Sequence, residues 1–142
     1  MPFRLIYSSE ATPGLAAAEL EEMLAESRIR NQVYGITGVL LFVEGAFLQI
    51  LEGEKDDVLG LMERIERDPR HRGVKVFYEQ EVDERAFASW SMAYLSPSAE
   101  EVAKWAELEG ATTIGAVLAS IESNPGRLPV MVVNILKTLA AP

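Results

Sequence analysis

The chain has 142 residues, of which 49% are hydrophobic and 25% charged, a composition that predicts a globular domain and excludes a disordered chain. Its net charge of −9 repels phosphate groups, so we expect neither a nucleic acid nor a membrane as a partner. The absence of cysteine and the single histidine exclude disulfides, thiolate nucleophiles and multi-histidine metal sites.

The N-terminus passes directly into an apolar strand, Phe3–Ser8. It lacks the hydrophobic region of a signal peptide, and no run reaches about 20 apolar residues, so we expect a cytoplasmic protein. Alternation along the strand places Phe3, Leu5 and Tyr7 on one face. A tyrosine in such a place usually belongs to the core, with its hydroxyl bonded to a backbone group.

A helix is predicted from Leu15 to Arg30. Its apolar stripe becomes polar at the C-terminal end, at Ser27 and Asn31. Asn31 alone is typical of a helix cap. Two small hydrogen-bonding side chains at the end of an apolar face also suit a pocket for a flat ligand that carries amide groups.

Two apolar runs, Val39–Val43 and Ala46–Leu51, meet at Glu44-Gly45 and predict a β-hairpin. Gln49 lies inside the second run with apolar neighbours on both sides. A buried amide without partners costs a few kcal/mol, so some group must hydrogen-bond this side chain. A cross-strand or backbone group is the simplest partner.

A second helix is predicted from a cap at Asp56 or Asp57 to about Arg67, and a charged cluster follows its last turns. The candidate residues in this cluster are Arg64, Arg67, Asp68 and His71. The cluster is either a solvated helix end, whose cations suit the helix dipole, or a contact to a phosphate or to the edge of a ring.

Two more strands are predicted, one over Gly73–Gln80 and one within Phe87–Tyr94. In the latter, Trp90, Met92 and Tyr94 share a face, and core packing is the simplest account of the first two. The order of elements indicates an α+β fold, the ferredoxin-like βαββαβ pattern with an added fifth strand. Both helices are expected on one face of a mostly antiparallel sheet.

Residues 97–142 are predicted to form three helices, near Ser98–Leu108, from Thr112 or Thr113 to Ser123, and over Leu128–Leu139. The last is apolar almost all round. We expect it to pack on the open sheet face or against a second copy in a homodimer or higher homo-oligomer. The chain is therefore divided into an α+β domain, 1–96, and a helical extension, 97–142.

Several segments together resemble the BLUF family of blue-light sensors that use FAD. In chain order they are R-L-I-Y-S-S, S-R-I-R-N, G-I-T-G-V-L-L-F-V-E-G-A-F-L-Q-I-L-E-G, I-E-R-D-P-R-H and F-A-S-W-S-M. The resemblance covers about Pro2 to Leu95, and its specificity lies in the combination, since each motif alone is short. It implies a photoreceptor that binds FAD, has no catalytic activity of its own, and signals to a downstream protein partner.

The resemblance also implies roles for single residues. Tyr7 corresponds to the tyrosine that gives an electron and a proton to the excited flavin, and Gln49 to the glutamine between that tyrosine and the flavin. Asn31 corresponds to the asparagine that holds the flavin carbonyl side. Trp90 and Met92 correspond to a pair near the glutamine that is linked to signalling, and either of them is a candidate for the place next to Gln49.

Further cofactor contacts are implied at Ser27, Arg30, Arg64, Arg67, Asp68 and His71. A changed hydrogen-bond pattern at Gln49, by rotation or tautomerisation of its amide, fits a chain without cysteine, which forms no thiol adduct. Two alternatives are a small ferredoxin-like enzyme that uses Arg30 and Asn31 on a phosphate, and a ferredoxin-like ligand-binding or interaction module. The enzyme lacks a glycine-rich anion loop, and the module leaves Tyr7 and Gln49 unexplained.

Overall fold

The central strand of the sheet, β3, carries Gln49 and is buried along its whole length. The computed structural model describes residues 1–141. In chain order its elements are β1 (Phe3–Ala11), α1 (Ala17–Tyr34), β2 (Thr37–Val43), β3 (Ala46–Gly53), α2 (Lys55–Arg67), β4 (His71–Glu81), β5 (Ala93–Leu95), α3 (Ala99–Trp105), α4 (Ile114–Ser123) and α5 (Arg127–Ala140). The strands lie in the order β4-β1-β3-β2-β5, with β5 parallel to β2 and the other pairs antiparallel.

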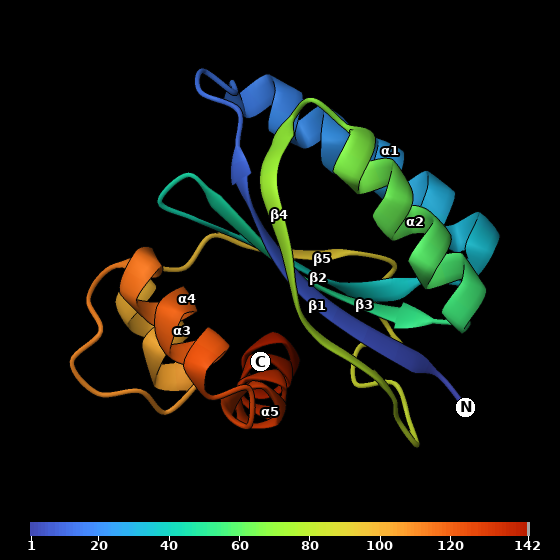
Figure 1. Ribbon diagram of the computed structural model, residues 1–142. Coiled ribbons are helices and arrows are strands. Elements are labelled where there is room, and N and C mark those ends of the chain that lie inside the picture. The colour runs from blue at the N-terminus through green and yellow to red at the C-terminus, as the bar shows by residue number, and fades with distance from the viewer. Residues whose placement is uncertain (142) are drawn as a thin grey trace.

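Alternation along the strands divides the core into two layers, one on each face of the sheet (Figure 1). Tyr7 and Phe47 belong to the layer under α1 and α2. Ile6, Leu48 and Ile50 belong to the layer under α3, α4 and α5. The α+β prediction is confirmed: the sheet has the added fifth strand, two helices on one face and the C-terminal helices on the other.

The ends of the first two helices differ from the prediction. Helix α1 continues to Tyr34, so Asn31 lies inside it and is not its cap. The helix ends at Gly35, whose φ of 66° is a left-handed conformation that glycine adopts without strain. Neither Asp56 nor Asp57 caps α2. Both lie in its first turn, where their charges suit the helix dipole.

The predicted fifth strand is much shorter than expected. Residues 82–92 form neither helix nor strand, and β5 contains three residues only. Trp90 and Met92 therefore precede the strand and do not share a face of it. The reason is that the carbonyl groups of Trp90 and Met92 are bonded to Gly38 N and to the Arg28 side chain, outside any strand ladder.

The C-terminal helices cover the second sheet face. Helix α3 begins with a capping box between Ser98 and Glu101, a pattern that satisfies two free donors at a helix start. Helix α5 buries Leu128, Met131 and Ile135 in the core that it shares with the strands. This packing accounts for most of its apolar character. No helix within residues 1–141 is both long enough and apolar enough to cross a membrane.

Candidate cofactor site

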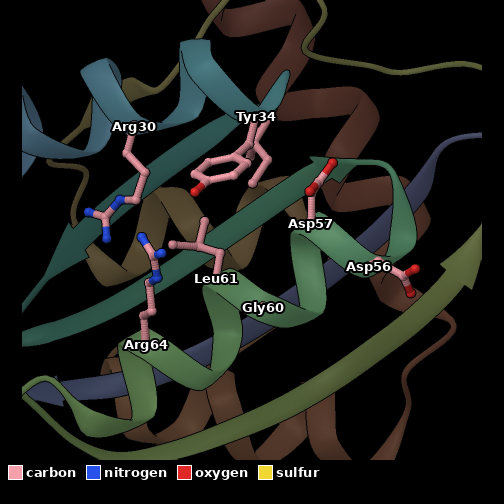
Figure 2. A pocket seen from close by; sticks show the side chains of 8 residues that line it. Arg30, Tyr34, Asp56, Asp57, Gly60, Leu61 and Arg64 are labelled. Carbon is pink, nitrogen blue, oxygen red and sulfur yellow. The ribbon is translucent and has the colours of Figure 1, made fainter.

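A cavity lies between α1, α2 and the sheet face that carries Tyr7 and Gln49. Its lining residues are Met23, Ser27, Arg30, Asn31, Leu40, Gln49, Leu61, Arg64, Ile65, Asp68, Arg70 and His71. A neighbouring hollow, shown in Figure 2, extends the same gap toward Tyr34 and the first turn of α2. The packing of two helices over one sheet face thus gathers side chains from five elements, α1, β2, β3, α2 and β4.

Tyr7, Gln49 and Met92 form a chain of hydrogen bonds beside this cavity. Tyr7 and Gln49 are directly opposite each other in the pairing of β1 with β3. The Tyr7 hydroxyl donates to Gln49 Oε1, and Gln49 Nε2 donates to Met92 Sδ at 3.2 Å. All three side chains are buried. The buried amide therefore has a donor on one side and a soft sulfur acceptor on the other.

The environment keeps the Tyr7 phenol protonated. Burial raises the pKa of Tyr7 well above its ordinary value, and the negative charge of Asp68 raises it further. A neutral phenol has one hydrogen-bond donor, and in Tyr7 this O–H donates to Gln49.

Two buried side-chain polar atoms among residues 1–141 have no hydrogen-bond partner, and they belong to consecutive residues that line the cavity. They are Nε of Arg30, a donor, and Oδ1 of Asn31, an acceptor. The other end of the Asn31 amide is occupied, because Nδ2 donates to the Ser91 carbonyl at 2.9 Å. An unsatisfied buried group costs about 1–3 kcal/mol, so these atoms suit a ligand with both acceptors and donors at its edge.

Arg30 and Arg64 point toward each other from α1 and α2 across the gap (Figure 2). The Arg64 guanidinium also lies 5.8 Å from the centre of the Tyr34 ring, within the range of a cation–π contact. Two guanidinium groups that face the same space repel each other in the absence of negative charge. This part of the site therefore favours an electron-rich or anionic group.

The charged cluster at the end of α2 is only partly as predicted. Arg64, Asp68 and His71 line the cavity. Arg67 does not, although Arg64 and Arg67 are both exposed residues of the last turns of α2. Arg70, which the sequence reasoning missed, lines the cavity and binds Asp68 through Nη2 at 2.7 Å. The local signal for it is the spacing Asp68-x-Arg70.

Hydrogen bonding and burial tune this cluster. The bonds from Arg70 hold the pKa of Asp68 below its ordinary value, and the same pair raises the pKa of Arg70. Burial lowers the pKa of His71, whose Nδ1 is hydrogen-bonded to Ser9 Oγ at 2.8 Å. The imidazole ring packs 4.9 Å from Phe47, centre to centre. His71 is therefore a neutral wall of the cavity at ordinary pH.

Met92, and not Trp90, occupies the place next to Gln49. Met92 belongs to the layer under α1 and α2, whereas Trp90 packs at the edge of the opposite layer. The Trp90 ring makes an edge contact with Phe87, with centres 6.4 Å apart. The sequence leaves both arrangements open, and the structure contains the one with methionine inside.

Taken together, these features define a ferredoxin-like α+β domain with a partly polar cavity between its first two helices and the sheet, beside a buried Tyr–Gln pair. The family model described as BLUF, sensors of blue-light using FAD, matches residues 3–93, and the chain belongs to this family. Its cofactor is FAD, as the family description states. The resemblance found in the sequence is thereby confirmed.

Curated relatives are much longer proteins. The chain is 38% identical over 89 residues to photoactivated adenylate cyclase subunit beta of Euglena longa, and 36% identical over 85 residues to subunit alpha of Euglena gracilis. These matches cover 62% and 60% of the chain but only 10% and 8% of the relatives, so the chain spans about a tenth of their length.

Solved structures match over nearly the whole of both chains. The dark-state structure of the BLUF protein BlrB has 26% sequence identity and a TM-score of 0.76, with 96% of each chain covered. The ground state of BlsA has 30% identity and a TM-score of 0.78, covering 93% of this chain and 88% of that one. Residues 3–93 thus form a BLUF sensor domain.

Proposed function

We propose that this protein is a blue-light photoreceptor in which Tyr7 is the electron and proton donor and Gln49 is the switch. The observation that carries the proposal is the buried chain Tyr7–Gln49–Met92 beside a cavity suited to the family's cofactor. Bound FAD supplies the absorption of blue light and, when excited, the capacity to accept an electron and a proton. The remaining steps belong to side chains of the protein.

The residues that hold the cofactor in this proposal are those with free polar groups in the gap. Asn31 Oδ1 and Arg30 Nε are buried without partners, and Arg64 faces Arg30 across the same space. Ser27, Asp68 and His71 complete the polar wall, and Arg70 positions Asp68 through their ion pair. Arg67 is not in this set, since it does not line the cavity or the neighbouring hollow.

The switch is a change in the hydrogen bonds of the Gln49 amide. Tyr7 gives up an electron and its phenolic proton and later recovers both, so the cycle is balanced. While the phenol is deprotonated, its bond to Gln49 Oε1 is lost, and the amide is free to rotate or to tautomerise. Because Nε2 is held by Met92 Sδ, a soft and weak acceptor, the two arrangements of the amide lie close in energy.

The output passes to the C-terminal helices and from there to a partner protein or to a change in homo-oligomeric assembly. The support for this part is spatial, because Met92 contacts Gln49 while the same segment leads through β5 into α3. Residues 97–142 act in this view as the transmitting extension of the photosensory domain, residues 1–96.

The experiment is to record absorption spectra of the purified protein before, during and after blue illumination. We expect a yellow protein with bound FAD, whose flavin band moves to longer wavelength in blue light and returns in the dark. A colourless protein that also fails to take up added FAD would contradict the proposal. So would a flavin-loaded protein whose spectrum does not respond to light.

A further inference from the structure

Glu52 is a fully buried carboxylate on β3, three residues after Gln49. Alternation places it with Leu48 and Ile50, on the sheet face opposite the cofactor cavity. It therefore cannot contact a ligand in that cavity. A buried charge is tolerated only when it is paired and hydrogen-bonded, so its partners indicate its purpose.

The carboxylate has three partners. The main-chain N–H groups of Ala86 and Phe87 donate to Oε2 at 2.9 Å and to Oε1 at 2.8 Å, respectively. Arg4, opposite Glu52 in the pairing of β1 with β3, donates to Oε2 at 2.9 Å through Nε, and its Nη2 lies 2.8 Å from the same oxygen. The two carboxylate oxygens thus bind the main chain at residues 86 and 87, the start of the segment that leads to Met92. These hydrogen bonds are charge-assisted and therefore stronger than bonds between neutral groups.

The segment that Glu52 binds, residues 86–92, connects the core layers on the two faces of the sheet. Phe87 is buried in the layer under the C-terminal helices, and Trp90 packs against it. The Trp90 carbonyl then accepts a bond of 3.1 Å from Gly38 N, and Met92 reaches Gln49 in the other layer. Glycine at position 38 also allows β2 to lie close to β3, because a Cβ there would lie 1.9 Å from the Ile50 carbonyl oxygen.

We propose that Glu52 is the positioning residue of the switch: it fixes one end of the segment 86–92 to β3, the strand that carries Gln49, so that Met92 at the other end is held against the Gln49 amide. This inference rests on the proposed function. Movement of Met92 relative to this fixed point then alters the packing of Trp90 against the C-terminal layer. Glu52 and Gln49 lie on the same strand, β3, so a motion of the whole sheet carries both together. Only a change at the Gln49 amide itself therefore moves Met92 relative to Glu52.

The test compares Glu52→Gln with Arg4→Gln in the FAD-loaded full chain. A glutamine presents only one acceptor to the two N–H groups, so it releases one of them, whereas Arg4→Gln removes the ion pair and leaves both N–H bonds in place. We expect Glu52→Gln to bind FAD and to shift in blue light, but to recover in the dark about fivefold faster, because a less restrained segment rearranges more readily. Arg4→Gln should recover at close to the parental rate.

Equal acceleration of dark recovery in both variants would assign the effect to the ion pair and overturn the proposal. Recovery of Glu52→Gln at the parental rate would overturn it as well.

Should Glu52→Gln fail to fold, hydrogen exchange of the parent protein tests the proposal. Illumination should increase exchange at Trp90, Ser91 and Met92 and leave the Ala86 and Phe87 amides protected. Loss of protection at those two amides would show that they are not a fixed point. A parent protein that does not bind FAD or respond to light refutes the proposed function instead.

Discussion

Tyr7 and Gln49 face each other on adjacent antiparallel strands, and the phenol donates to the amide oxygen. The pairing of β1 with β3 fixes their separation, so the contact depends on the sheet and not on flexible loops. The remaining side of the amide is held by Met92 Sδ. A fixed donor on one side and a weak acceptor on the other make the amide the group in the site whose hydrogen bonds change at least cost.

Replacing Gln49 by leucine removes both hydrogen bonds of the amide while keeping a side chain of similar size. We expect Gln49→Leu to bind FAD and to lose the light-induced red shift, measured by difference absorption spectroscopy. The Tyr7 hydroxyl is left without its acceptor, which lowers the free energy of unfolding by about 1–3 kcal/mol. A normal shift in this variant would refute the role of Gln49.

Tyr7→Phe removes the electron and proton donor and retains the buried ring. The variant should fold and hold FAD yet be silent in blue light, as checked by the same spectra and by transient absorption. The double variant Tyr7→Phe/Gln49→Leu is the control for stability. Because it leaves no unpaired phenol, we expect it to be more stable to urea than Gln49→Leu alone.

Arg64 and Arg67 provide a matched pair on one helix, because both are exposed arginines and only the first lines the cavity. We expect Arg64→Ala to weaken FAD binding about tenfold, the effect of losing one charge-assisted hydrogen bond. Arg67→Ala should bind as the parent does. Fluorescence titration of the apoprotein with FAD measures both, and equal losses would contradict the assignment of Arg64 to the site.

His71 makes the stability of the fold sensitive to acid. Burial lowers its pKa in the folded state, so below the unfolded value of about 6.5 the unfolded chain binds more protons, and stability falls as the pH decreases. We expect the free energy of unfolding of His71→Gln to change less than that of the parent between about pH 7.5 and about pH 5. Asp68 does not interfere, since its lowered pKa acts only at lower pH, below its unfolded value of about 3.9. Urea titrations at constant FAD concentration provide the measurement, and identical pH dependence in both proteins would exclude His71 as the source.

The alternation of apolar residues along the chain is enough to determine much of the site. It places Tyr7 with Phe3 and Leu5, and Gln49 with Phe47 and Leu51, and all of these lie in one layer of the core. Side-chain alternation follows from the geometry of the extended backbone alone. The positions of Ser27 and Asn31 on one face of α1 follow in the same way from the helical repeat.

The arrangement of residues 82–92 is decided only by tertiary packing. The local pattern indicates a strand within Phe87–Tyr94, but the main chain of residues 86–92 is bonded to Glu52, Gly38 and Arg28, which lie more than 30 positions away in sequence. No local period encodes such contacts, and so the choice of Met92 over Trp90 beside Gln49 is visible only in the folded chain. The sequence determined which residues form the switch. Tertiary packing decided that Met92, and not Trp90, contacts Gln49. The reason is that residues 86–92 cross from one core layer to the other at the edge of the sheet, and this crossing places the two side chains in different layers.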